Sequence, residues 1–193
     1  MASEKSAVGQ RTVFQVGSIT LEGNLSLPDQ AQAMVLFAHG SGSSRFSSRN
    51  NFVAEKLNER SLSTFLIDLL TSEEDEIDQR TRELRFDIDL LAERLVGAID
   101  WLANESSTKN LPIGLFGAST GAAAALIAET QRPDQVYAVV SRGGRPDMAK
   151  DALGNVQSPT LLIVGGLDHQ VIDLNKTAQR QMRAKNELRI VEV

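Results

Sequence analysis

Ser119 stands at the centre of a five-residue segment, Gly117 to Gly121, that has the pattern G-x-S-x-G. A short apolar run at 113–116 comes before it, and an alanine-rich stretch follows. A serine at such a strand-to-helix turn has a strained backbone and an exposed hydroxyl, and small residues are needed two positions away on both sides. The pattern predicts a nucleophile for acyl transfer. The alternative is a turn rich in small residues and without chemistry.

A glycine-rich loop at 39–44 follows another apolar run, residues 34–38. Backbone N–H groups in such a loop can point at an anion, either the oxyanion of acyl transfer or a phosphate. The loop lacks the G-x-x-x-x-G-K-[ST] pattern of a P-loop and the G-x-G-x-x-G pattern of a dinucleotide fold. Paired with the serine turn, it favours an oxyanion hole that has one N–H from this loop and one from the residue after Ser119.

Asp168 lies just past the end of the apolar run at 160–164, after Gly165, Gly166 and Leu167. Active sites of open α/β sheets lie at the carboxyl edge of the strands. The chain order Ser then Asp matches the order Ser, Asp, His of α/β-hydrolases. An Asp after a strand is otherwise a turn residue or a helix cap. Beside the other two motifs, a role as the acid of a catalytic triad is favoured.

Strands and helices that would position these motifs alternate along the chain. Alternating apolar and polar residues at 13–16 and 19–27, around a glycine-containing turn, predict a β-hairpin. Continuous apolar runs then predict strands buried on both faces. These strands are expected at 34–38, 63–67, 113–116, 136–140 and 160–164, with a more alternating one at 188–193. Helices are expected at about 51–59, 88–102, 120–130 and 173–185.

This order predicts a single α/β domain over residues 1–193, built as a three-layer α/β sandwich. Its sheet would be mostly parallel, with the hairpin as an antiparallel N-terminal edge. Only about twenty residues separate the strands at 136–140 and 160–164, so we expect no cap domain and an open site. The acidic segment at 71–78 is expected to be a solvated loop before a helix, with a mobile flap over the site as the alternative.

The composition limits the classes of function. The chain has 193 residues and a net charge of −5, which gives no general attraction to nucleic acid or to anionic membranes. It has no cysteine, and therefore no disulfide, thiolate nucleophile or cysteine metal site. No signal-peptide pattern and no window of 18 apolar residues is present, so a cytoplasmic location is expected.

The three motifs together resemble an α/β-hydrolase of the dienelactone-hydrolase-like group, and the resemblance extends from the hairpin to Val193. The stretches that resemble a bacterial cytoplasmic branch of this group are 44–50, 84–87 and 141–147. Dienelactone hydrolases proper use a cysteine nucleophile, so lactone specificity is not implied. The resemblance implies these roles: Ser119 as nucleophile, the N–H groups of Ser41 and Thr120 as oxyanion donors, Asp168 as triad acid, and His39 and Gly40 as support for the oxyanion loop.

A catalytic serine needs a base, and the chain has two histidines. The resemblance implies a structural role for His39. His169 directly follows Asp168, and because neighbouring side chains diverge, it is badly placed as the base. In similar hydrolases the histidine lies after the last strand, where this sequence stops. We therefore expect a C-terminally incomplete version of a longer protein; a chain that has lost catalysis is the alternative.

Four arginines are expected to border the carboxyl edge of the sheet: Arg45, Arg49, Arg142 and Arg145. One hypothesis is that one or more of them, with Arg142 as the first candidate, binds a carboxylate or phosphate of the substrate by a bidentate contact. The alternative, which the sequence favours, is that they are surface charges and braces for loops.

The expected function is a serine hydrolase that acts on a carboxylic ester, thioester or related acyl bond through an acyl-enzyme. No metal or cofactor is implied, and the expected partner is a small-molecule acyl substrate. The 193-residue chain itself is expected to be weak or inactive without its base. The alternatives are an acyltransferase and a non-catalytic binding protein on the same fold. Apolar sheet surface left exposed by a missing last helix would favour a homo-oligomer.

Overall fold

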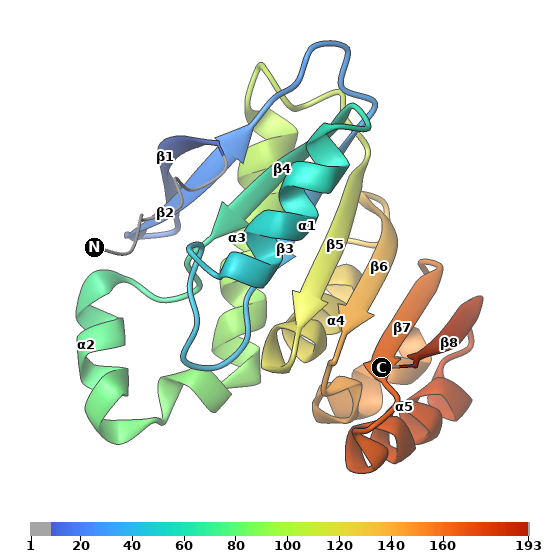
Figure 1. The fold of residues 1–193 in the computed structure, drawn as a ribbon. Coiled ribbons are helices and arrows are strands. Elements are labelled where there is room, and N and C mark those ends of the chain that lie inside the picture. Colours follow the sequence, from blue (N-terminus) through green and yellow to red (C-terminus); the bar gives the residue numbers. More distant parts are fainter. Residues whose placement is uncertain (1–8, 193) are drawn as a thin grey trace, which may run out of the picture.

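A computed structural model describes residues 9–192 as one eight-stranded sheet with helices on both faces (Figure 1). The strand order is β1-β2-β4-β3-β5-β6-β7-β8. The strands are β1 Gln10–Val16, β2 Ile19–Ser26, β3 Ala33–Ala38, β4 Leu62–Ile67, β5 Ile113–Ala118, β6 Val136–Arg142, β7 Thr160–Gly165 and β8 Asn186–Val191. β1 and β2 form the antiparallel edge, and β3 to β8 run parallel. This confirms the predicted architecture, although Val193 of the predicted last strand lies outside the described residues.

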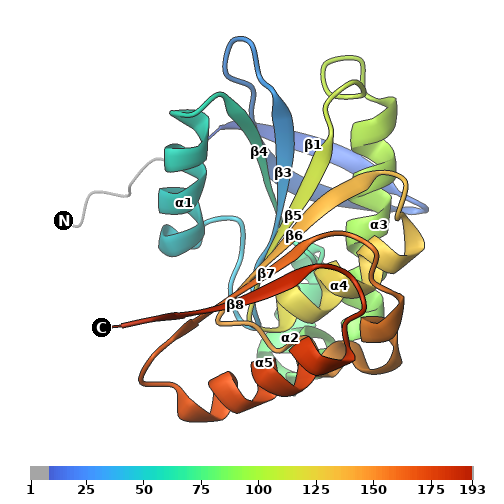
Figure 2. The ribbon, with the colours of Figure 1, turned by 90° about the vertical axis from the view of Figure 1, so that its right-hand side faces the viewer.

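The helices divide unequally between the two faces of the sheet (Figure 2). They are α1 Ser48–Asn58, α2 Ser72–Thr81, α3 Ile88–Asn104, α4 Thr120–Gln131 and α5 His169–Gln181, with 3₁₀ helices at Leu84–Phe86 and Pro146–Asn155. The α3, α4 and α5 side covers the larger core cluster. On the other face, α1 covers a small cluster that includes Phe37, Leu66 and Phe116. Within residues 9–192, no helix combines the length and apolar character needed to cross a bilayer.

An aromatic cluster fixes the hairpin edge to the rest of the molecule. Phe14 of β1 lies 5.2 Å from Phe65 of β4 and 5.5 Å from Trp101 of α3, measured between ring centroids. Phe65 and Trp101 are 5.4 Å apart, so the three rings are in mutual contact. Tilted aromatic pairs at such distances add to the stabilisation that burial provides. The hairpin is therefore part of the main core, although it lies at the end of the sheet.

The structure corrects two sequence expectations. The acidic segment expected as a loop is helix α2, which begins with a reciprocal capping box: Glu74 N–H donates to the Thr71 hydroxyl, and Thr71 N–H donates to the Glu74 carboxylate. Acidic residues in the first turn also interact favourably with the helix dipole. Helix α5 begins at His169 rather than near residue 173, because the Asp168 side chain accepts from the N–H of Val171 as N-cap.

Gly97 of α3 gives a test of how closely the helix packs on the hairpin. A methyl group placed on Gly97 would lie 2.2 Å from a methyl of Val16 in β1. In an open helix, Gly→Ala stabilises by about 1 kcal/mol. Here overpacking outweighs that gain, and we expect Gly97→Ala to lower the free energy of unfolding by about 1–3 kcal/mol in urea denaturation.

Val16→Ala provides the matched background for that measurement. If the clash with Val16 is the cause, Gly97→Ala should be less destabilising in the Val16→Ala protein than in the wild type. An increase in stability on Gly97→Ala alone would contradict the close packing of α3 on β1.

Candidate active site

Ser119 occupies a sharp turn between β5 and α4. Its backbone has φ 51° and ψ −123°, a conformation rarely adopted by residues with a side chain. The carbonyl of Ser119 accepts from the N–H of Ala122 at 3.1 Å and from the N–H of Arg145 at 3.0 Å. The loop after β6 therefore holds the strained turn from one side. No hydrogen bond engages the half-buried Ser119 hydroxyl within residues 9–192, so it is available to react.

Close backbone approaches hold the turn from the other sides. A Cβ on Gly121 would lie 2.4 Å from the carbonyl oxygen of Ala38, at the end of β3. A Cβ on Gly117 would lie 2.4 Å from Cα of Ala122. No side chain fits at either position, so both glycines of the G-x-S-x-G pattern are required for steric reasons. The start of α4 can then lie directly against the end of β3, and the N-terminal end of its dipole lies at Ser119.

The structure brings the glycine-rich loop against the serine. A Cβ on Gly40 would lie 2.9 Å from Cβ of Ser119. The hydroxyls of Ser41 and Thr120 are hydrogen-bonded at 3.0 Å. Thr120 is the first residue of α4, where helix N–H groups have no partner inside the helix. The two residues whose backbone N–H groups were predicted to form an oxyanion hole are thus linked to each other beside Ser119.

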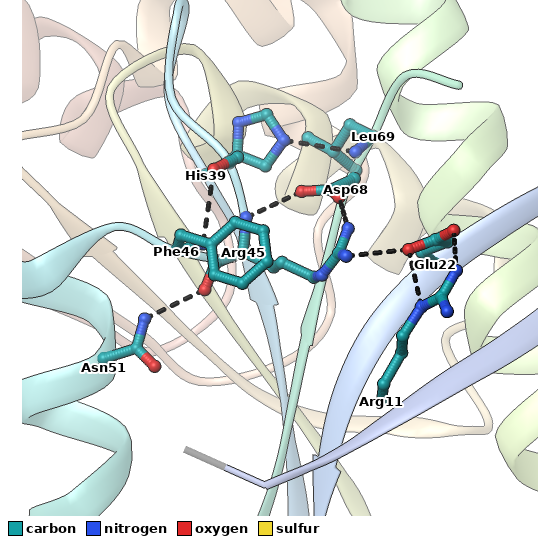
Figure 3. Close-up of polar contacts among 9 residues, drawn as sticks. Arg11, Glu22, His39, Arg45, Phe46, Asn51, Asp68 and Leu69 are labelled. Carbon is teal, nitrogen blue, oxygen red and sulfur yellow. Dashed lines mark hydrogen bonds and ion pairs between the residues drawn. The ribbon is translucent and has the colours of Figure 1, made fainter. Parts of the chain in front are cut away.

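His39 braces the same loop with both ring nitrogens (Figure 3). Its Nε2 accepts from the N–H of Leu69 at 3.1 Å, which leaves the proton on Nδ1, and Nδ1 donates to the carbonyl of Gly40 at 2.9 Å. Burial of the ring lowers the pKa of His39 below its ordinary value of 6.5, so the neutral form is favoured. These contacts suit a structural residue, and neither nitrogen is free to take a proton from Ser119.

Arg45 anchors the far end of the loop through a chain of charges (Figure 3). Its guanidinium is paired with Asp68, which follows β4, and with Glu22 of β2 at 2.7 Å. Glu22 is also paired with Arg11 of β1. The Arg45 carbonyl accepts from the side-chain amide of Asn51 in α1 at 2.9 Å. Arg45 is therefore a brace between the loop, the hairpin and α1.

Asp168 lies at the carboxyl end of β7, two strands from β5, and is exposed. Its carboxylate accepts from the N–H of Val171 at 3.2 Å, so it serves as the N-cap of α5. His169 is exposed as the first residue of that helix. No hydrogen bond joins either side chain to Ser119 in the described part of the chain. The structure thus places Asp168 at the expected edge of the sheet but does not assemble a triad.

A cavity of about 270 Å³ lies on one side of the oxyanion loop, between Gly40–Ser44 and α2. Its wall includes a buried ion pair that the sequence did not reveal. Asp78 accepts from Arg85 Nε at 2.6 Å and from the Arg85 N–H at 3.0 Å. Burial acts to raise the pKa of Asp78, but the hydrogen bonds from Arg85 outweigh it and hold the pKa below its ordinary value. Residues 71–78 were expected to form a loop, so there was no helical spacing from which the pairing of Asp78 with Arg85 could be predicted.

Two more of the arginines predicted at this edge, Arg145 and Arg142, differ in their partners. Arg145 is paired with Asp147, with distances of 2.9 and 2.8 Å from Nε and Nη2. Arg142 donates from Nη2 to the Asn50 amide oxygen at 2.9 Å and has no carboxylate partner. Across residues 9–192, no group of three or more His, Asp and Glu side chains is arranged to hold a metal ion.

The sequence and structure match known proteins over nearly the whole chain. The model of the "Dienelactone hydrolase family" matches residues 21–192. A crystal structure of dienelactone hydrolase from Anabaena variabilis is 57% identical, with a TM-score of 0.93 over 95% of this chain and 85% of that one. Est1E from Butyrivibrio proteoclasticus has a TM-score of 0.76 over 94% of this chain and 88% of its own, but at 14% identity it shows the fold alone.

Two curated relatives come from Mycobacterium tuberculosis, strains H37Rv and CDC 1551, and both are named "Putative phosphoribosyl transferase". Each is 51% identical over 175 residues, which are 91% of this chain and 39% of the relative. The chain thus spans about two fifths of the length of these relatives. With the match over residues 21–192 and the close likeness to the Anabaena structure, the chain belongs to the dienelactone hydrolase family.

Proposed function

We propose that this domain is a serine hydrolase that cleaves a carboxylic ester, thioester or related acyl bond through an acyl-enzyme. The observation that carries the proposal is the Ser119 turn, with φ 51° and ψ −123° and a hydroxyl that has no partner in the described chain. A strained serine with an unbonded hydroxyl at the start of a helix is the arrangement that nucleophilic acyl transfer requires.

In this mechanism the Ser119 oxygen attacks the acyl carbonyl, and the N–H groups of Ser41 and Thr120 donate to the oxyanion that forms. Such donors act strongly because they are already in place when charge develops. The alcohol or thiol leaves with a proton, and water then attacks the acyl-Ser119 ester to release the acid. The hydrogen bond between the Ser41 and Thr120 hydroxyls supports this assignment, because it fixes the loop against the start of α4.

The assignment of the base follows from the hydrogen bonds of the two histidines. His39 is a brace, because both of its nitrogens are already bonded to backbone groups. His169 is exposed beside Asp168 and has no contact with Ser119. We therefore propose that neither of these two histidines is the base of the reaction. The same observation favours, as a second candidate, a protein that binds an acyl compound without turning it over.

The phosphoribosyl transferase activity in the name of the mycobacterial relatives is not proposed for this chain. The match covers 39% of each of those proteins, and the named activity is that of the whole relative. Hydrolysis is instead supported by the family match and by the likeness to the Anabaena hydrolase over 95% of this chain.

Imidazole in solution tests whether Ser119 is a nucleophile that needs a base. We expect p-nitrophenyl acetate to acetylate the chain slowly, and imidazole to accelerate acetylation at Ser119 by about tenfold or more, because general-base catalysis contributes roughly 10²–10⁴-fold when the base is positioned. Intact-mass and peptide mass spectrometry would give the rate and position of the acetyl group.

Ser119→Ala is the control, and it should show no acetylation at the turn at any imidazole concentration. A fluorophosphonate probe should label Ser119 in the wild type and leave other serines unlabelled. Equal labelling of several surface serines, without a preference for Ser119, would contradict the hydrolase proposal. The second candidate, a protein that binds an acyl compound without turnover, would then be favoured.

His39 should make stability depend on pH, because the folded protein lowers the pKa of His39 by burial. Below the ordinary pKa of 6.5 the unfolded chain binds a proton that the folded chain resists. The free energy of unfolding should therefore fall as pH falls through 6.5 towards the lower folded pKa. Urea denaturation between pH 7.5 and 5 would measure the slope.

His39→Gln is the matched variant, since glutamine is polar but does not titrate. It should be less stable than the wild type at pH 7.5, and its stability should change less between pH 7 and 5.5. If the two proteins lost stability in parallel over this range, His39 would not be held neutral by the fold. His169 is exposed in both proteins and therefore cancels in the comparison.

A further inference from the structure

Arg142 ends β6 immediately beside the nucleophile turn. In the parallel pairing of β5 with β6, its Cα lies opposite that of Ala118, the residue before Ser119. Three residues later, the N–H of Arg145 donates to the Ser119 carbonyl. The Arg142 side chain is half-buried and lies on the α1 face of the sheet, where it contacts Asn50 of α1. A cation is thus fixed next to the reacting serine by the same backbone that holds the serine.

Within residues 9–192, no carboxylate is paired with the charge on Arg142. In the described part of the chain, its one hydrogen bond runs from Nη2 to the neutral amide of Asn50, and its Nε is buried without a partner. Burial, and then repulsion from the Arg49 guanidinium, lower the pKa of Arg142. Burying a cation without a paired anion is unfavourable. The other buried or half-buried arginines that bear on the site, Arg45, Arg85 and Arg145, are all paired with carboxylates.

Arg49 increases the local positive potential. It lies in the first turn of α1, one residue before Asn50, and is exposed. Across residues 9–192 no hydrogen bond or ion pair is present for its side chain. Two guanidinium groups that repel each other and lack an acid between them form an arrangement that an oxyanion would stabilise by bidentate hydrogen bonds. The protein has a net charge of −5, so acidic side chains outnumber basic ones. Two arginines without an acidic partner beside the nucleophile therefore depart from the overall charge balance.

We propose that Arg142 and Arg49 bind an anionic substituent of the acyl substrate, a carboxylate or phosphate group that is separate from the bond to be cleaved. This subsite rests on the proposed function, since it assigns the substrate class of the Ser119 site. Asn50 orients Arg142 by accepting from Nη2, and the guanidinium N–H groups other than the buried Nε donate to the anion. The sequence placed four arginines at this edge. Arg45 and Arg145 are paired with carboxylates and act as braces, whereas Arg142 and Arg49 have no carboxylate partner within residues 9–192.

Binding without turnover tests the subsite independently of catalysis. Monomethyl succinate and dimethyl succinate have the same ester but differ by one negative charge at pH 7. We expect the wild-type chain to bind the monoester at least roughly tenfold more tightly, equivalent to about 1.4 kcal/mol, in an NMR titration. Arg142→Gln should abolish the preference, and Arg49→Gln, which alters an exposed side chain, should reduce it.

Arg132→Gln is the control, because Arg132 is paired with Asp100 at the opposite end of α4 and should keep the full preference. Competition by inorganic phosphate, compared with competition by acetate, distinguishes a phosphate substituent from a carboxylate. Equal binding of the two succinates by the wild type would overturn the proposal, as would an unchanged preference in Arg142→Gln. If Arg142→Gln fails to fold, an unchanged preference in Arg49→Gln overturns it instead.

The two proposals fail in different ways. A charge preference that depends on Arg142, together with no acetylation of Ser119, would retain the anion subsite and reject the hydrolase. Acetylation of Ser119 with no charge preference would retain the hydrolase and reject the anion subsite.

Discussion

The backbone of Ser119 is the constraint on which the rest of the site depends. A φ of 51° with ψ −123° is unfavourable for a residue with a side chain, so the surroundings must stabilise it. They do so from three directions: β3 lies against Gly121, α4 against Gly117, and the loop after β6 donates an N–H to the Ser119 carbonyl. Lys150 has nearly the same backbone, with φ 49° and ψ −126°, at an exposed position within the 3₁₀ segment Pro146–Asn155. Strain alone therefore does not identify a nucleophile; the contacts around it do.

The polar groups around the turn differ in whether their hydrogen bonds are satisfied. His39 is bonded through both ring nitrogens, and Arg45 and Asp68 are bonded to each other, so the oxyanion loop is held rigidly. Fixed donors do not need to reorganise when charge develops on a substrate, which is the source of their effect. Within residues 9–192, the Ser119 hydroxyl has no hydrogen-bond partner, and the Arg142 guanidinium has no carboxylate partner. Buried atoms without a partner also occur elsewhere, such as Ser63 Oγ and Arg94 Nε, so the position of Ser119 and Arg142 at the turn is what points to a site.

The sequence was sufficient for the elements and motifs whose signals are local. Apolar runs predicted the strands, and the G-x-S-x-G pattern identified the turn, because its steric requirements involve residues a few positions apart. The α2 helix was missed because its stability comes from a cap at Thr71 and from long-range ion pairs of Glu74 with Arg94 and of Asp78 with Arg85. Similarly, no pattern could say which arginine has a carboxylate partner, since Arg45 finds Asp68 and Glu22 only after the sheet has assembled.

Charge is distributed unequally on the two sides of the serine turn. On the α2 side, the cavity beside the oxyanion loop is lined by Asp68, Asp75 and Asp78, and the pairs formed by Arg45 and Arg85 neutralise part of this charge. On the α1 side, neither Arg142 nor Arg49 is paired with an acid anywhere in residues 9–192. Unpaired charges in a partly buried edge are weakly screened, so this asymmetry produces a local field across Ser119. A substrate with an anion at one end would be oriented by that field before its ester reached the serine. Orientation of this kind places the acyl carbonyl at the oxyanion donors and the charged end at α1, and no lid is needed to achieve it.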